Sequence, residues 1–228
     1  MKPYLLTCAV LALAACSEKP APAPPAQKAA EAAPAAPKST APAGAYTLDP
    51  SHASVTFKVK HLGFSNYTAG FDKIAGKLTF DPANPAAMAV EATIDVNSLD
   101  LNTPPAGFHD ELMSAMFFES AKFPTITFKS TKVEVTGADT AKVTGDLTLH
   151  GVTKPVTLDT TFNGGWAANA FDGARAGFSA HTVLKRSDFG MTSGIPAPGT
   201  SMGVSDEVEV SIEAEFGSGA KIAASAPS

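Results

Sequence analysis

The chain has 228 residues, with 17 basic and 22 acidic side chains and a formal net charge of -5. No basic run is longer than a pair such as Lys185 and Arg186. This balance argues against a nucleic-acid partner, because such proteins carry clustered basic side chains that neutralise phosphates.

The first residues, MKPYLLTCAVLALAAC, have the features of an export signal. A single Lys precedes an apolar run that is too short to cross a bilayer stably, and small residues follow at a cleavage point. The ending Leu13–Cys16 resembles the lipobox of bacterial lipoproteins, in which the Cys is lipidated once residues 1–15 have been removed. A plain secretory signal peptide is the alternative.

Lipidation of Cys16 predicts a stable membrane anchor, because several acyl chains hold a protein where one chain binds only reversibly. Cleavage would also remove Cys8, which leaves Cys16 without a disulfide partner in the same chain. Ser17, in place of Asp, resembles the sorting signal for the outer membrane. We therefore expect a periplasmic, lipid-anchored protein, held at the outer membrane.

Residues 16–45 are predicted to form a flexible tether. From Lys19 to Ala45 the chain is almost entirely Ala and Pro, with no large apolar side chain to build a core. Extended, polyproline-like conformations would let it reach up to ~80 Å, at about 3.1 Å per residue. Residues 46–217 are long enough for one domain, and residues 218–228 are predicted to be a disordered tail.

The domain has the alternating pattern of two-faced β-strands. Apolar side chains recur at every second position in the segments 55–59, 78–80, 90–96, 143–149, 156–158, 176–180 and 208–216. In the last of these, Glu209, Glu213 and Glu215 occupy the opposite, solvated face, which favours antiparallel sheets. Roughly eight such segments favour a closed antiparallel barrel, and a β-sandwich is the alternative.

Small residues on the inward face bear on whether such a barrel is hollow. They are Ala92, Gly145, Ala176, Ala180 and Ala214. An eight-stranded barrel is either just filled by side chains or just large enough for one ligand. The small residues favour a ligand, unless large neighbours such as Phe57, Phe80 and Phe128 interdigitate with them.

The stretch 108–124, FHDELMSAMFFESAKFP, is predicted to form a helix in this otherwise β-rich domain. Asp110 is an acid suited to the helix N-terminus, and Pro124 stops its continuation. Its apolar side chains lie on more than one helical face, so the helix must contact more than one apolar surface.

Catalytic and metal-binding patterns are weak. Gly199–Gly203, GTSMG, fits the nucleophile-elbow pattern, but a strand rather than a helix follows it, so we interpret it as an ordinary turn. The histidines are His52, His61, His109, His150 and His181, and none is paired at metal-ligand spacing. His61 and His181 lie beside strands and are the candidates if the pocket supports catalysis.

Several stretches together resemble the YceI-like family of bacterial periplasmic proteins. The most specific are GDLTLHGVTKPV, FFESAKFPTITFKST and KRSDFGM. The resemblance implies an eight-stranded, lipocalin-like antiparallel barrel that binds a polyisoprenoid or similar long amphiphile and has no catalytic residues. The family's helical segment usually opens with Arg-Asp, whereas this chain has His109 and Asp110. In KRSDFGM, we expect Lys185, Arg186 and Asp188 to form a turn held by a surface ion pair, which contributes little stability.

On this resemblance we predict a lipid-binding barrel that carries or sequesters an isoprenoid or isoprenoid quinone, with the helix 108–124 as a lid over one end. For this helix, the alternative is that it only closes the core of a ligand-free barrel. The predicted ligand-binding residues are Phe57, Val59, Phe80, Ile94, Met113, Phe117, Phe128, Leu147, Leu149 and Phe178. No cofactor, metal or nucleic acid is expected, and a homodimer is left open. The alternatives are a scavenger of other lipophiles, such as fatty amides or hydrophobic antibiotics, and an enzyme that uses the pocket.

Overall fold

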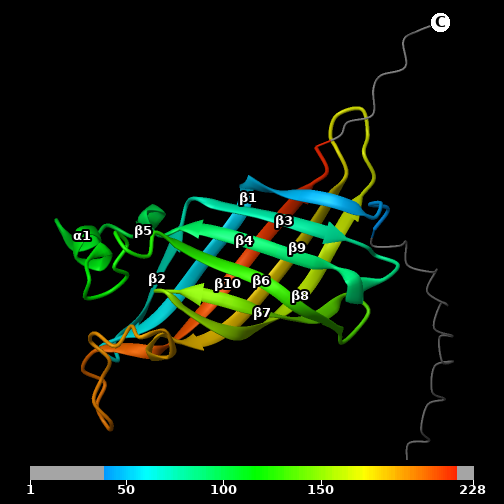
Figure 1. Ribbon diagram of the computed structural model, residues 1–228. Coiled ribbons are helices and arrows are strands. Elements are labelled where there is room, and N and C mark those ends of the chain that lie inside the picture. The colour runs from blue at the N-terminus through cyan, green and yellow to red at the C-terminus, as the bar shows by residue number, and fades with distance from the viewer. Residues whose placement is uncertain (1–38, 220–228) are drawn as a thin grey trace, which may run out of the picture. The chain divides into compact units, whose positions relative to one another are not determined.

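The computed structural model describes residues 39–219 (Figure 1). Its strands are β1 (Gly44–His61), β2 (Ser65–Phe71), β3 (Ile74–Phe80), β4 (Ala89–Asp95), β5 (Leu99–Leu101), β6 (Thr125–Val135), β7 (Thr140–Leu149), β8 (Val152–Trp166), β9 (Arg175–Lys185) and β10 (Val204–Gly217). The helices of this range are α1 (Phe108–Met113) and the 3-10 turns η1 (Pro85–Ala87), η2 (Val96–Ser98) and η3 (Arg186–Phe189). The predicted signal sequence, Cys16 and most of the tether and tail lie outside the described residues.

Eight of the strands close into an antiparallel barrel. Neighbours follow the order β1, β10, β9, β8, β7, β6, β4 and β3, and β3 returns to the first residues of β1. Val55 of β1 lies opposite Ile212 of β10, and Gly44 lies opposite Phe80 at the closing seam. Because each of the eight strands has a hydrogen-bonded neighbour on both sides, the predicted barrel is confirmed and the sandwich alternative is wrong.

The two parts of β1 have different neighbours on one side of the barrel. The last part of β1, from Val55 to His61, pairs with β2 instead of β3, and β2 pairs in turn with the short β5. Two hydrogen bonds join the turn between β2 and β3 to Ser98 of η2. The Asp72 N–H donates to the Ser98 carbonyl at 3.0 Å, and the Lys73 N–H donates to the Ser98 hydroxyl at 3.0 Å. β6 pairs with β4 but not with β5. The chain between β5 and β6, residues 102–124, therefore packs at the place where two strands are not joined.

The predicted helix over 108–124 is wrong in length, because α1 ends at Met113. Asp110 does lie in the first turn, but the N-cap is Gly107, at a φ of 79° that favours glycine. Ser114 adopts an extended conformation, and turns follow as far as Glu119, whose φ is 47°. Consecutive apolar residues at 116–118 cannot share one helical face, and the turns resolve this conflict by directing Phe118 inward and leaving Met116 exposed.

Two clusters of buried side chains lie at opposite ends of the barrel. One surrounds Tyr46 and Phe80, whose rings meet edge to face at 5.5 Å, where β1 begins. The other surrounds Phe71 and Phe189, where β1 ends, and Leu112 and Phe118 of the segment 102–124 pack against it. Most inward side chains between the clusters are only partly buried, which is expected where they face an internal space.

The packed domain begins earlier than the predicted boundary at residue 46. Ser39 forms a β-bridge with Gly165, Ala41 is 4% exposed, and the Tyr46 hydroxyl donates to the Pro42 carbonyl at 2.7 Å. A Cβ on Gly165 would lie 2.6 Å from the Arg175 carbonyl oxygen, so only glycine allows this close approach. Residues 39–45, predicted as tether, therefore belong to the folded domain.

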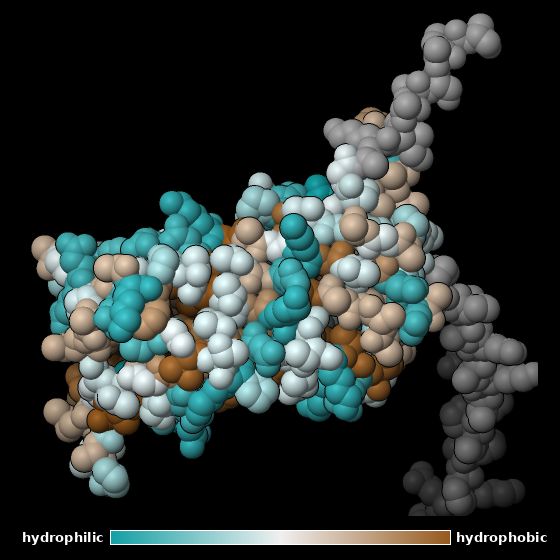
Figure 2. Space-filling view, viewed as in Figure 1, coloured by the Kyte–Doolittle hydropathy of each residue, from teal (hydrophilic) through white to brown (hydrophobic). Residues whose placement is uncertain are grey.

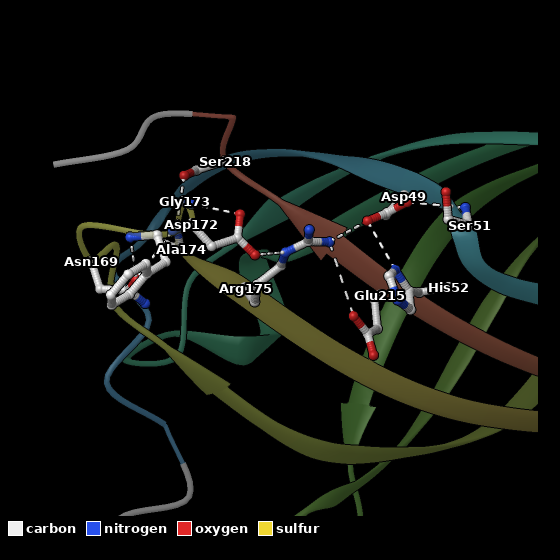
Figure 3. A network of polar contacts seen from close by, with 11 residues as sticks. Asp49, Ser51, His52, Asn169, Asp172, Gly173, Ala174, Arg175, Glu215 and Ser218 are labelled. Carbon is white, nitrogen blue, oxygen red and sulfur yellow. Dashed lines mark hydrogen bonds and ion pairs between the residues drawn. The ribbon is translucent and has the colours of Figure 1, made fainter. Parts of the chain in front are cut away.

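A half-buried arginine, whose side chain is 19% exposed, joins β1, β9 and β10 outside the barrel wall (Figure 3). The Arg175 guanidinium donates to Asp49 at 2.6 Å and to Asp172 at 2.8 Å, and lies 3.9 Å from Glu215. The hydrogen bond from Arg175, with further ones from His52 and the Ser51 N–H, holds the pKa of Asp49 well below its usual range. The charged form of Asp49 is thus stabilised in the folded state.

Candidate functional site

An apolar cavity of about 1000 Å³ occupies the interior of the barrel. It runs from Pro82 and Met88, near the β3–β4 connection, to Pro104 and Phe117 in the segment 102–124. The alternation of the strands forms it, because every second side chain points inward. The walls are therefore built from the residues that also give the sequence its period of two.

The structure brings nine of the ten predicted ligand-binding residues to this cavity. They are Phe57, Val59, Phe80, Ile94, Phe117, Phe128, Leu147, Leu149 and Phe178. Met113 does not line it, and packs instead against the buried cluster around Phe71 and Phe189. This placement follows from the early end of α1, since a continued helix would have presented Met113 and Phe117 on neighbouring turns.

The predicted ligand-binding set left out several large side chains that line the cavity, namely Phe71, Phe118, Phe162, Phe216, Leu158 and Ile212. The last three lie in segments whose alternation was recognised from the sequence, whereas the first three were missed. Phe162 lies on the same face of β8 as Leu158, so the alternation could have revealed it. Phe71 belongs to β2, whose sequence SNYTAGF has too few apolar residues to be recognised as a strand.

Aromatic rings line the end of the cavity nearer the start of β1. Phe80 lies 5.8 Å from Phe162, Phe162 lies 5.2 Å from Phe178, and Phe178 lies 6.2 Å from Phe216, measured between ring centroids. Such contacts stabilise one another beyond the area they bury. They make this part of the wall apolar and closely packed.

The small inward residues have two different roles. Ala92, Ala180 and Ala214 line the cavity and leave its cross-section open. Gly145 instead accommodates a ring, since a Cβ there would lie 2.4 Å from Cζ of Phe128. Ala176 is fully buried in the end cluster. Both interpretations of the small residues therefore hold, each for part of the barrel.

The segment 102–124 forms part of the cavity wall beside β5. Thr103, Pro104, Pro105, Phe108, Leu112, Phe117 and Phe118 all line the cavity. Phe118 meets Phe71 edge to face at 6.1 Å, and the Ser193 hydroxyl donates to the Met116 carbonyl at 2.6 Å. Leu112 and Met113 also pack against the cluster around Phe71 and Phe189, and the ring of Phe123 meets that of His150 at 4.9 Å. The segment is thus held to the barrel at several points.

The prediction that Arg186 of KRSDFGM takes part in a surface ion pair is wrong, because this residue is buried. Its side chain is 8% exposed and lines the cavity. It donates to the carbonyls of Ser193 at 2.6 Å, Val204 at 2.7 Å and Ser205 at 2.9 Å. Burial lowers the pKa of Arg186. These hydrogen bonds hold the loop before β10 against the guanidinium. The surface ion pair of this segment is formed instead by Asp188 and Lys154, at 3.1 Å.

Tyr67 is a notable polar residue of the cavity wall. It lies in β2 opposite Val59, and its hydroxyl is buried with no hydrogen-bond partner among the described residues. An unsatisfied buried hydroxyl costs about 1–3 kcal/mol. A ligand group or a water molecule that accepted a hydrogen bond there would recover this cost.

The residues considered for catalysis are dispersed. His61 lines the cavity, whereas the side chain of His181 is 67% exposed, is not among the cavity-lining residues and lies 4.0 Å from Asp159. Gly199–Gly203 lies in the loop before β10, which confirms the ordinary turn. Within residues 39–219 no group of three or more His, Cys, Asp and Glu side chains is placed to hold a metal ion. No helix in the same range is long and apolar enough to cross a membrane.

Comparison with known proteins finds the same barrel elsewhere. The YceI-like domain matches residues 46–216. Protein YceI of Salmonella arizonae is 42% identical over 179 residues, which cover 77% of this chain and 88% of the relative. The crystal structure of Burkholderia cenocepacia BcnA superposes with a TM-score of 0.63 at 28% identity, over 74% of this chain and 98% of BcnA. A polyisoprenoid binding domain from Saccharophagus degradans, implicated in plant cell wall breakdown, superposes with a TM-score of 0.57 at 16% identity, over 75% of this chain and 97% of that domain, and so shares the fold.

Proposed function

The chain belongs to the YceI-like family, and from this premise we propose that it is a non-catalytic lipid-binding protein. Its ligand is a polyisoprenoid or an isoprenoid-quinone-like amphiphile, held inside the barrel for transport, storage or sequestration. The observation that carries the proposal is the apolar cavity of about 1000 Å³, which reaches the upper end of the ~300–1,000 Å³ range of ligand pockets.

The energetics of the cavity favour an occupied state. Inward side chains that face an empty space of about 1000 Å³ have no contacts on that side and lose the dispersion energy that a filled interior would supply. Water has few hydrogen-bond partners on an apolar wall. A hydrocarbon chain fits better, at ~0.8 kcal/mol per buried CH2 before association costs.

The polar groups of the wall favour a head that accepts hydrogen bonds. The Tyr67 hydroxyl has a donor to offer, whereas the guanidinium of Arg186 is already engaged with backbone carbonyls. A quinone carbonyl or an alcohol oxygen placed at Tyr67 would satisfy the hydroxyl without burying a new charge. A Tyr67→Phe variant should therefore keep the cavity and lose the preference between ligand heads.

The location forms part of the same proposal. Cleavage before Cys16 and lipidation of this residue would hold the barrel in the periplasm at the outer membrane. A chain labelled with radioactive palmitate should carry the label, and a Cys16→Ser chain should not. Label retained by Cys16→Ser would contradict the lipid anchor and leave the ligand proposal intact.

The ligand proposal is tested by native mass spectrometry of residues 37–228, followed by solvent extraction and mass analysis of the bound material. BcnA is matched over 98% of its length by 74% of this chain, so a barrel of this kind folds without the segment that precedes it here. One long-chain isoprenoid per protein is the expected result. A bare protein that also takes up no added isoprenoid would refute the proposal.

The same experiment separates the runner-up functions. Fatty amides or other lipophiles in place of isoprenoids would identify a scavenger. An apolar wall selects ligands mainly by their length and width, so it would admit these molecules as well. Turnover of the bound lipid that is lost in His61→Ala while binding survives would identify an enzyme. His61 is the histidine for this test, because it lines the cavity whereas His181 faces solvent.

A further inference from the structure

Three large apolar side chains protrude from loops at the end of the barrel that carries α1. They are Phe64, 85% exposed, Met116, 62% exposed, and Met202, 73% exposed. Apolar residues, coloured tan and brown, lie at this left-hand end in Figure 2. We call these three side chains the apolar rim. Single exposed apolar residues are ordinary on protein surfaces, so the rim needs an argument from its arrangement.

The three loops of the rim are joined to one another. The Leu62 N–H donates to the Gly203 carbonyl at 2.8 Å, which fixes the turn before Phe64 next to the residue after Met202. The Ser193 hydroxyl donates to the Met116 carbonyl at 2.6 Å, and the Val204 N–H donates to the Gly194 carbonyl at 2.8 Å. The rim is therefore one assembly of loops at one end of the barrel.

The rim continues directly into the cavity wall. Phe117 follows Met116, Val204 lies two residues after Met202, and His61 precedes the turn to Phe64, and all three of these neighbours line the cavity. Each protruding side chain therefore stands beside a residue that faces the interior. A surface that covered the rim would lie against this end of the cavity.

We propose that the apolar rim inserts into a lipid bilayer and that the ligand passes between the bilayer and the cavity at this end. The inference rests on the proposed function, because a long isoprenoid is insoluble in water and resides in a membrane. Loop tips that carry Phe and Met bury their side chains at the boundary between headgroups and acyl chains, where apolar area determines binding strength. The lipid then leaves the bilayer without exposing its chain to water.

The N-terminal chain is long enough for this orientation. Ser39 pairs with Gly165, which pairs with Ala176 of the opposite end cluster, so the chain joins the barrel at the end away from the rim. Residues between Cys16 and Ser39 could span up to ~70 Å at about 3.1 Å per residue. The strand β1, whose bounds are Gly44 and His61, could span ~60 Å at about 3.3 Å per residue if it lay parallel to the barrel axis. A lipid-anchored barrel can therefore turn its rim toward the same membrane.

The test is flotation of residues 37–228 with vesicles of equimolar phosphatidylethanolamine and phosphatidylglycerol. The rim variant Phe64→Ser/Met116→Ser/Met202→Ser should lower the partition coefficient at least about tenfold. The control Trp166→Ser/Phe171→Ser removes exposed aromatic side chains, 50% and 89% exposed, from the opposite end. It should leave the partition coefficient unchanged. A control that loses vesicle binding while the rim variant keeps it would overturn the proposal.

A second measurement separates this inference from the proposed function. Ligand bound per protein, measured by native mass spectrometry, should be equal in the wild type and the rim variant, while transfer of a fluorescent isoprenoid from vesicles slows in the variant. Vesicle binding that depends on the rim, without any bound ligand, would refute the proposed function and the passage of ligand, and would support only the insertion of the rim. Fast transfer by the variant would refute the rim and keep the function. Loss of self-association in sedimentation, with vesicle binding unchanged, would identify the rim as a contact between copies and refute insertion.

Discussion

Replacing Ala180 with Phe should close the middle of the cavity without unfolding the barrel. Ala180 lies on the inward face of β9, opposite Thr160 of β8 and Ile212 of β10, and it lines the cavity. The new ring would project into space that is open in the wild type. It adds buried apolar area instead of displacing packed atoms, so the free energy of unfolding should change little.

The loss of ligand affinity can be worked from the hydrocarbon that the ring excludes. If the ring displaces one isoprene unit, whose five carbons contribute ~0.8 kcal/mol each, binding weakens by ~4 kcal/mol. This corresponds to about a thousandfold increase in Kd, at 1.4 kcal/mol per tenfold. Fluorescence titration with a labelled isoprenoid measures the affinity, and a thermal melt reports the fold.

The matched control is Val183→Phe on the outer face of the same strand, where the side chain is 57% exposed and does not line the cavity. It adds a ring of the same size and should leave Kd unchanged. A folded Ala180→Phe protein that binds with wild-type affinity would refute the reasoning, because the ligand could not then occupy the barrel interior. If Ala180→Phe melts early, Ala180→Leu provides a smaller obstruction at the same position.

Three further predictions concern the lid, the wall and the charge network. Phe117→Asp should shorten ligand retention in a dissociation assay without lowering the melting temperature, whereas Met113→Asp should destabilise the fold, because Met113 packs against a buried cluster; equal effects would contradict this division. Gly145→Val should destabilise the domain by about 3 kcal/mol or more in urea titration, because its Cβ would meet Phe128 at 2.4 Å. The lowered pKa of Asp49 in the folded state means that its stabilising contribution is present above its unfolded pKa and is lost as the pH falls through that value toward the folded one. Asp49→Asn should therefore flatten the acid side of the stability profile, and an unchanged profile would refute this assignment.

Much of the fold follows from local pattern. Alternation in segments such as 208–216 identifies the inward faces, because successive side chains of a strand point to opposite sides whatever the strand pairs with. Most predicted lining residues, Phe57 and Phe178 among them, reached the cavity for this reason. Ala92 and Ala180 also left it open as their size suggested.

Other features depend on contacts between distant segments. The end of α1 at Met113 could not be read from the apolar residues that follow it, because the gap between β5 and β6 decides where those residues pack. Arg186 was assigned to a surface ion pair because its carbonyl partners lie across the loop before β10. The buried position of Ala41 likewise requires Gly165 from another part of the chain.

The sequence by itself thus determined the antiparallel β class and the apolar character of the inward faces, since both depend on a period of two that each strand carries alone. Only the tertiary structure decided where the cavity runs, which loop covers it and which end presents Phe64, Met116 and Met202. These features arise from closure of β3 onto β1 and from the bend that separates β5 from β6. Closure and bending are set by pairings between residues far apart in the chain, for which a local pattern contains no signal.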